Sequence, residues 1–87
     1  MTIATLKAQL GKFKQMNQDR QRTILGELLY PLIAKVVKQP DSAPKVTGML
    51  IDFTVFDVDD IVDFLENTET LEEKVREAEE LMVSQGN

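Results

Sequence analysis

Apolar residues recur every three or four positions along nearly the whole chain, the spacing of one face of an α-helix. Near the N-terminus the pattern runs through Ile3, Leu6, Leu10 and Phe13, and Gly11 weakens the end of that helix. No segment alternates apolar and polar residues as a half-buried strand does. The pattern therefore predicts an all-α fold, a compact bundle of about five helices forming a single domain over residues 1–87.

Two adjacent apolar rows predict a central helix that begins after Asn17, a residue type that caps helix N-termini. Pro31 lies inside this helix and cannot donate a hydrogen bond to the Glu27 carbonyl, so we expect a kink or a division there. An apolar stripe this wide predicts that other helices pack against the central helix on two sides. The two rows are Ile24/Leu28/Leu32/Val36 and Leu25/Leu29/Ile33/Val37.

The segment "QPDSAP", residues 39–44, predicts a loop because it contains two prolines around Asp-Ser. Pro44 suits the first turn of a helix that runs to about Phe53. Two more helices follow, each too short to be stable alone. The C-terminal "SQGN" should fray, with residues 86–87 as a tail. Asp57 or a neighbour caps the first of these helices, and Asn67 or Thr68 caps the second. Their apolar stripes are Val58, Ile61, Val62 and Leu65, and Leu71, Val75, Ala78 and Met82, respectively.

Composition narrows the chemistry. The 87 residues include no cysteine and no histidine, so disulfides, thiol chemistry, the usual general base and the commonest metal ligand are all missing. No run approaches the roughly 20 apolar residues of a membrane span, and "MTIATLKAQL" lacks the layout of a signal peptide. We expect a cytoplasmic, monomeric domain that uses no cofactor or metal and does not enter a membrane.

Charge is distributed unevenly. Residues 1–45 hold eight Lys/Arg and three Asp/Glu, a net +5, whereas residues 46–87 hold two and twelve, a net −10, which together give the net charge of −5. The basic residues stand between apolar rows at helical spacing and lack the interleaved aromatic residues of a base-stacking surface. We interpret them as a solvated helix face and expect no direct binding of nucleic acid by this domain.

Two glycines occupy predicted helix interiors, Gly26 in "LGELLY" and Gly48 in "KVTGMLIDF". Glycine inside a helix costs about 0.5–1 kcal/mol relative to alanine, so each needs a local reason. One interpretation is that both allow two helices to approach closely. The other is that the missing side chains leave a slot for a ring of a partner, and periodicity alone does not decide between them.

Three ordered segments carry a resemblance to a known family: "ILGELLYPLI" (24–33), "KVTGMLIDF" (45–53) and "LENTETLEEKVREAEELM" (65–82). They resemble the MLLE domain, the C-terminal domain of cytoplasmic poly(A)-binding proteins. The resemblance covers about residues 17–85 and leaves residues 1–16 as a divergent N-terminal helix. Such domains are also found in a HECT-type ubiquitin ligase and in fungal RNA-transport proteins, so the resemblance leaves the parent protein open.

The resemblance implies a helical module that captures short disordered segments carrying the poly(A)-binding-protein-interacting motif, in which a leucine precedes a phenylalanine by several residues. Such a module recruits translation, deadenylation or transport factors to poly(A)-bound mRNA. The phenylalanine pocket maps onto Thr23, Gly26, Glu27, Tyr30, Lys45, Thr47 and Gly48. The leucine pocket maps onto Met49, Leu50, Ile51, Lys74, Ala78 and Leu81.

Several positions depart from the family pattern. Thr23 stands where glutamine is common, Pro44 where glycine is common, and Asp52 where the signature closes with glutamate. The segment "DFTVFDVDD", residues 52–60, is about two residues longer than usual. These departures indicate a distant member whose motif preference differs or in which one pocket is weak.

Two other classes of protein have partial signals. An acyl carrier protein bears phosphopantetheine on a serine that follows aspartate, as Ser42 does in "PDSAP", although Ala-Pro follows where leucine is expected. Asp57, Asp59 and Asp60 suggest a calcium loop, but the loop glycine and the closing glutamate are missing. No carboxylate stands in a recognisable pattern with a nucleophile, so the sequence does not indicate an enzyme.

Overall fold

The computed structural model describes residues 1–84, and all of its regular structure is helical, which confirms the all-α prediction. The predicted tail at residues 86–87 lies outside the described residues, whereas Ser84 of "SQGN" is still helical. The elements are α1 (Ile3–Ala8), α2 (Leu10–Lys14), α3 (Gln18–Val36), the 3-10 helix η1 (Pro40–Ser42), α4 (Ala43–Leu50), α5 (Val58–Glu66) and α6 (Thr68–Ser84).

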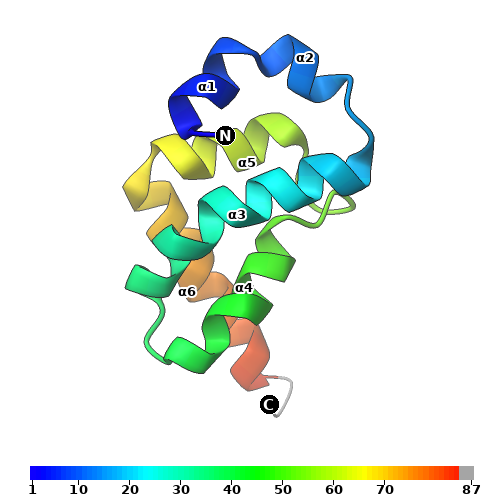
Figure 1. The fold of residues 1–87 in the computed structure, drawn as a ribbon. Coiled ribbons are helices and arrows are strands. Elements are labelled where there is room, and N and C mark those ends of the chain that lie inside the picture. Colours follow the sequence, from blue (N-terminus) through cyan, green and yellow to red (C-terminus); the bar gives the residue numbers. More distant parts are fainter. Residues whose placement is uncertain (85–87) are drawn as a thin grey trace.

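Helix α3 is central and packs against α4, α5 and α6, so the prediction that it is contacted from more than one side is confirmed (Figure 1). One of its two apolar rows is buried, with Leu25, Leu29 and Ile33 fully inaccessible to solvent. The other row, which begins at Ile24, is only partly buried and packs around that core. The burial of one row fixes which side of α3 faces inward and leaves the neighbouring side open.

The N-terminal segment is two short helices, α1 and α2, so the prediction of one continuous helix is wrong. The break is at Gln9, whose backbone (φ −119°, ψ 29°) leaves the helical region, while Gly11 lies inside α2. The bend lets the fully buried Leu6 and Phe13 both reach the core. Figure 1 shows α1 lying beside α5, at the end of the molecule away from the C-terminal end of α6.

Helix α3 continues through Pro31, so of the two predicted outcomes, a kink or a division, the division does not occur. A proline removes only one intrahelical hydrogen bond, and Pro31 sits on the exposed side of a helix whose opposite side is anchored by buried leucines. The packing of that side therefore keeps the helix continuous across the missing bond.

The connection between α3 and α4 is mostly helical, since η1 leads directly into α4, and the predicted loop is limited to the residues before Pro40. Pro44 lies in the first turn of α4, as predicted. Helix α4 ends at Leu50 rather than at Phe53. The Asp52 side chain ends it by accepting from the N–H and hydroxyl of Thr54, which turns the backbone away from the helix axis.

Side-chain caps define the starts of α5 and α6. The Asp57 carboxylate accepts from the N–H of Asp60, 2.9 Å away, and Asp60 accepts in return from the N–H of Asp57, which forms a capping box. The Asn67 side chain accepts from the N–H of Thr70 at the start of α6. Both predicted caps are therefore confirmed.

We predict that Asp57→Ala lowers the free energy of unfolding by about 1 kcal/mol, because the N–H of Asp60 loses its acceptor. Asp57→Asn keeps a side-chain oxygen at the same place and should change stability by only a few tenths of that amount. Urea unfolding followed by circular dichroism measures both variants. Equal destabilisation by Ala and Asn would show that the negative charge, and not the cap, supports α5.

Candidate functional site

Helix α4 forms a wall of two separate surface grooves. Its inward face is buried through Ala43, Val46 and Leu50 against the core, while Lys45 and Gly48 are exposed on the opposite face. The two remaining sides of the helix face α3 and α6, the elements with which it makes most of its contacts. One groove opens on each of these sides.

The α3–α4 groove encloses about 680 Å³ and is open to solvent along its length. Five of the seven residues predicted for the phenylalanine pocket line it, and Lys45 and Gly48 do not. Ile51, predicted for the leucine pocket, lies in this groove instead. The lining residues are Arg22, Thr23, Gly26, Glu27, Tyr30, Pro31, Pro44, Thr47 and Ile51.

The two threonines of the α3–α4 groove donate their hydroxyl protons to backbone carbonyls. The Thr23 hydroxyl donates to the Asp19 carbonyl at 3.0 Å, and the buried Thr47 hydroxyl donates to the Ala43 carbonyl at 2.7 Å. Both hydroxyls are thus engaged, and Pro31, Pro44 and Ile51 help to make the groove lining largely apolar. Tyr30 is 45% exposed at its rim, so its ring has a free face for a ligand.

The α4–α6 groove is smaller, about 210 Å³. Five of the six residues predicted for the leucine pocket line it, and Ile51 is the exception. Leu50 also belongs to the core, since it is only 3% exposed. The lining residues are Met49, Leu50, Asp52, Val55, Phe56, Lys74, Glu77, Ala78 and Leu81.

The wall of the α4–α6 groove opposite α6 comes from the turn between α4 and α5. The Phe56 ring is fixed edge-on against the buried Phe64, with ring centroids 5.1 Å apart and an interplanar angle of 86°. The Lys74 ammonium lies 5.9 Å from the Phe56 centroid and 3.4 Å from the Glu77 carboxylate. Phe56 therefore presents a fixed apolar surface, and the Lys74 ammonium lies over its ring.

Neither helix glycine is needed for helix packing. A methyl group built on Gly48 would meet nothing within 4 Å, and one on Gly26 would meet only the Ile51 side chain at an ordinary contact distance of 3.6 Å. The interpretation that both glycines allow two helices to approach closely is therefore wrong. What they provide is bare backbone toward solvent, in the α3–α4 groove at Gly26 and on the outward face of α4 at Gly48.

Sequence reasoning missed several groove residues. Arg22 stands four residues before Gly26 and Pro31 four residues after Glu27, so both follow from helical spacing, because residues four apart lie on one face. Val55 and Phe56 had no comparable signal, since they belong to the turn that was predicted partly as helix. Glu77 lies one turn from Lys74 and Leu81 on α6 and was predictable by the same spacing.

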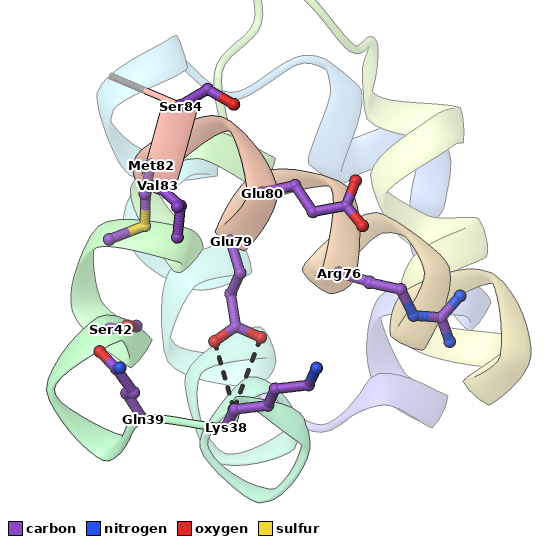
Figure 2. Close-up of a pocket in the computed structure, with 9 residues that line it drawn as sticks. All are labelled: Lys38, Gln39, Ser42, Arg76, Glu79, Glu80, Met82, Val83 and Ser84. Carbon is purple, nitrogen blue, oxygen red and sulfur yellow. Dashed lines mark hydrogen bonds between the residues drawn. The ribbon is translucent and has the colours of Figure 1, made fainter. Parts of the chain in front are cut away.

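Figure 2 shows a third hollow, of about 540 Å³, on the other side of α6, where the Glu79 carboxylate accepts from the backbone N–H of Lys38 at 3.2 Å. None of the predicted site residues lies there. Its cations, Lys38 and Arg76, are balanced by Glu79 and Glu80, so its charge favours neither an acidic nor a basic ligand.

The residues that suggested a calcium site or an acyl carrier protein have structural positions in the fold. Asp57 and Asp60 are engaged with each other in the capping box. Within residues 1–84 no three His, Cys, Asp or Glu side chains gather in a way that would hold a metal ion. Ser42, the serine of the acyl-carrier alternative, is 8% exposed. None of the helices in the described part of the chain combines the length and apolar character that crossing a membrane requires.

Comparison with known proteins identifies relatives. The chain is 39% identical over 84 residues to polyadenylate-binding protein 2 of Arabidopsis thaliana, covering 97% of the chain and 12% of that protein. It is 35% identical over 68 residues to a polyadenylate-binding protein, cytoplasmic and nuclear, of Eremothecium gossypii, covering 78% of the chain and 11% of the relative. The chain thus spans about a tenth of the length of these relatives.

The comparison with solved structures found no match. The profile of the MLLE domain matches residues 12–82, which include α3, α4, α5 and nearly all of α6. The match begins inside α2, so α1 lies outside it. The chain therefore belongs to the MLLE domain family of protein-interaction modules.

Proposed function

We propose that this domain captures short disordered segments in which a leucine precedes a phenylalanine by several residues, the poly(A)-binding-protein-interacting motif. The phenylalanine enters the α3–α4 groove and the leucine enters the α4–α6 groove. The domain is monomeric and cytoplasmic, contacts no nucleic acid itself, and recruits translation, deadenylation or transport factors to mRNA held by other parts of a longer poly(A)-binding protein.

The observation that carries this proposal is the pair of apolar grooves on either side of α4. A ligand with two separated apolar anchors fits two separate grooves, whereas one compact ligand does not. The larger groove suits a ring, because Gly26 leaves bare backbone beside Ile51 and the exposed Tyr30 offers a ring face. The smaller groove suits an aliphatic side chain between Met49, Phe56 and Leu81.

The exposed face of α4 supports a path between the grooves. A peptide that occupies both must cross this helix, and Gly48 is on the face that it crosses. Because open space surrounds the position where a Gly48 side chain would be, the peptide backbone can lie close to the helix there. Lys45, also exposed on this face, is placed to meet a peptide carboxylate or carbonyl.

The expected affinity is modest. Burying each anchor contributes about 1.5–3 kcal/mol, and ordering a flexible peptide offsets part of that gain. A dissociation constant in the micromolar range follows for a single motif, and several motifs on one partner would strengthen binding by avidity.

We predict opposite effects for two substitutions of Gly48. Gly48→Ala should raise the free energy of unfolding by about 0.5–1 kcal/mol, because alanine favours helix and its methyl group meets no neighbour. Gly48→Trp should abolish peptide binding while helicity is retained, because the indole obstructs the crossing. Urea unfolding and calorimetric titration measure the two effects. A folded Gly48→Trp variant with unchanged affinity would contradict the crossing path.

We predict that Met49→Ala abolishes measurable peptide binding by emptying a wall of the α4–α6 groove. The matched control is Met16→Ala, because Met16 is also partly buried against the core but lines neither groove. Calorimetric titrations use the motif peptide and two peptide variants, Phe→Ala and Leu→Ala. Each peptide variant should bind the unmodified domain about tenfold or more weakly than the motif peptide does.

A milder substitution, Met49→Leu, tests which anchor occupies this groove. Its effect should be non-additive with Leu→Ala in the peptide and additive with Phe→Ala, because only groups in contact couple. Unchanged affinity in Met49→Ala, or coupling of Met49→Leu to the phenylalanine instead, would overturn the assignment of the leucine to the α4–α6 groove.

A further inference from the structure

The turn between α4 and α5 contains an exposed threonine, Thr54, in an unusual setting. Two of the nine Ser and Thr residues, Thr54 and Thr70, have an acidic residue three positions further on. Thr70 lies in the first turn of α6 and is partly buried, whereas Thr54 is exposed and outside any helix. Three acidic residues, Asp57, Asp59 and Asp60, follow Thr54 within six positions.

We propose that Thr54 is a phosphorylation site for an acid-directed Ser/Thr protein kinase, and that a phosphate there weakens peptide binding in the α4–α6 groove. The effect on binding rests on the proposed function, whereas the modification itself does not. A kinase whose substrate cleft is basic complements the acidic run after Thr54. Thr5, Thr23 and Thr68 are also exposed but lie in helices and have no acidic residue three positions further on, whereas Thr54 is exposed in a turn and has one.

The reaction transfers the γ-phosphoryl group of ATP to Thr54 Oγ1. A bond forms between the γ-phosphorus and Oγ1, and the bond from that phosphorus to the oxygen bridging the β- and γ-phosphates breaks, so ADP leaves with the electron pair. The hydroxyl proton passes to the catalytic base of the kinase.

The hydroxyl that would be modified helps to hold the turn together. Thr54 Oγ1 donates to Asp52 Oδ1 at 2.6 Å, and the Thr54 N–H donates to the same oxygen at 2.9 Å. The Asp52 carbonyl in turn accepts from the N–H groups of Val55 and Phe56, both at 3.0 Å. Because Asp52, Val55 and Phe56 all line the α4–α6 groove, the turn sets one wall of that groove.

A phosphate reverses the electrostatics at this point. The esterified Oγ1 has no proton to donate to Asp52, and the phosphate adds a charge of about −1.5 to −2 beside the Asp52 carboxylate. The hydrogen bonds from Thr54, with a smaller contribution from Arg22, hold the pKa of Asp52 below its usual range, so this carboxylate is charged at neutral pH. Repulsion between the two groups should open the turn and displace Val55 and Phe56 from the groove.

The modification is tested by incubating the 87-residue chain with an acid-directed Ser/Thr kinase and ATP and locating the phosphate by mass spectrometry. We expect Thr54 to be the main site. Asp57→Asn should slow incorporation severalfold, because it removes the charge three positions after Thr54 while asparagine still caps α5. Absence of phosphate at Thr54, under conditions in which the kinase modifies an acidic reference peptide, would overturn the proposal.

The consequence is tested on the chain phosphorylated at Thr54. The amide resonances of Val55 and Phe56 should shift without any peptide present, and affinity for the motif peptide should fall about tenfold relative to the unmodified chain. In an Asp52→Asn background the phosphate should weaken binding less, because the opposing carboxylate is gone. Unchanged resonances, or equal affinities in the two forms, would overturn the regulatory effect. Failure of the unmodified chain to bind would instead count against the proposed function.

Discussion

The structure depends on how the eight-residue helix α4 is held between α3 and α6. A helix of two turns is not stable alone in water, so α4 exists because its inward face is buried. Ala43, Val46 and Leu50 are at most 3% exposed, and full burial of a Val or Leu side chain contributes about 1.5–3 kcal/mol. The same packing leaves the two flanks of α4 as groove walls. Displacement of this helix would remove the core contact and both grooves together.

The two ends of α4 set different parts of the site. At its start η1 and Pro44 bring the chain directly from the α3 connection into helix, and Pro44 then lines the α3–α4 groove. At its end Asp52 ends the helix and forms the turn that carries Val55 and Phe56 into the α4–α6 groove. The shape of each groove is therefore set by local backbone structure as well as by the packing of helices.

The periodicity of the sequence was sufficient to predict much of the helical fold, because helix formation and capping depend largely on local residues. The apolar stripes and the caps at Asn17, Asp57 and Asn67 are local signals, and all three caps form in the structure. The break at Gln9 and the continuity of α3 through Pro31 were not predictable, because both depend on tertiary packing overriding local preference. The end of α4 at Leu50 was missed because the Asp52 side chain competes with helical hydrogen bonding.

The residues of the candidate site could likewise be predicted from the sequence only where they lie on helices. Groove residues that lie at helical spacing from one another, such as Thr23, Gly26 and Tyr30, could be grouped from the sequence. Val55 and Phe56 could not, because a turn sets their positions. Periodicity also left the purpose of Gly48 undecided, since only the three-dimensional structure shows that no neighbouring side chain of residues 1–84 lies within 4 Å of a methyl group placed there.

The central claim is that one peptide occupies both grooves by crossing α4 at Gly48. A titration of the isotope-labelled domain with the motif peptide, followed by NMR, tests this most directly. We predict that amide resonances in the α3–α4 groove (Gly26, Ile51), at Gly48 and in the α4–α6 groove (Val55, Ala78) shift together with one dissociation constant. Shifts confined to one groove, or different dissociation constants for the two grooves, would contradict the account.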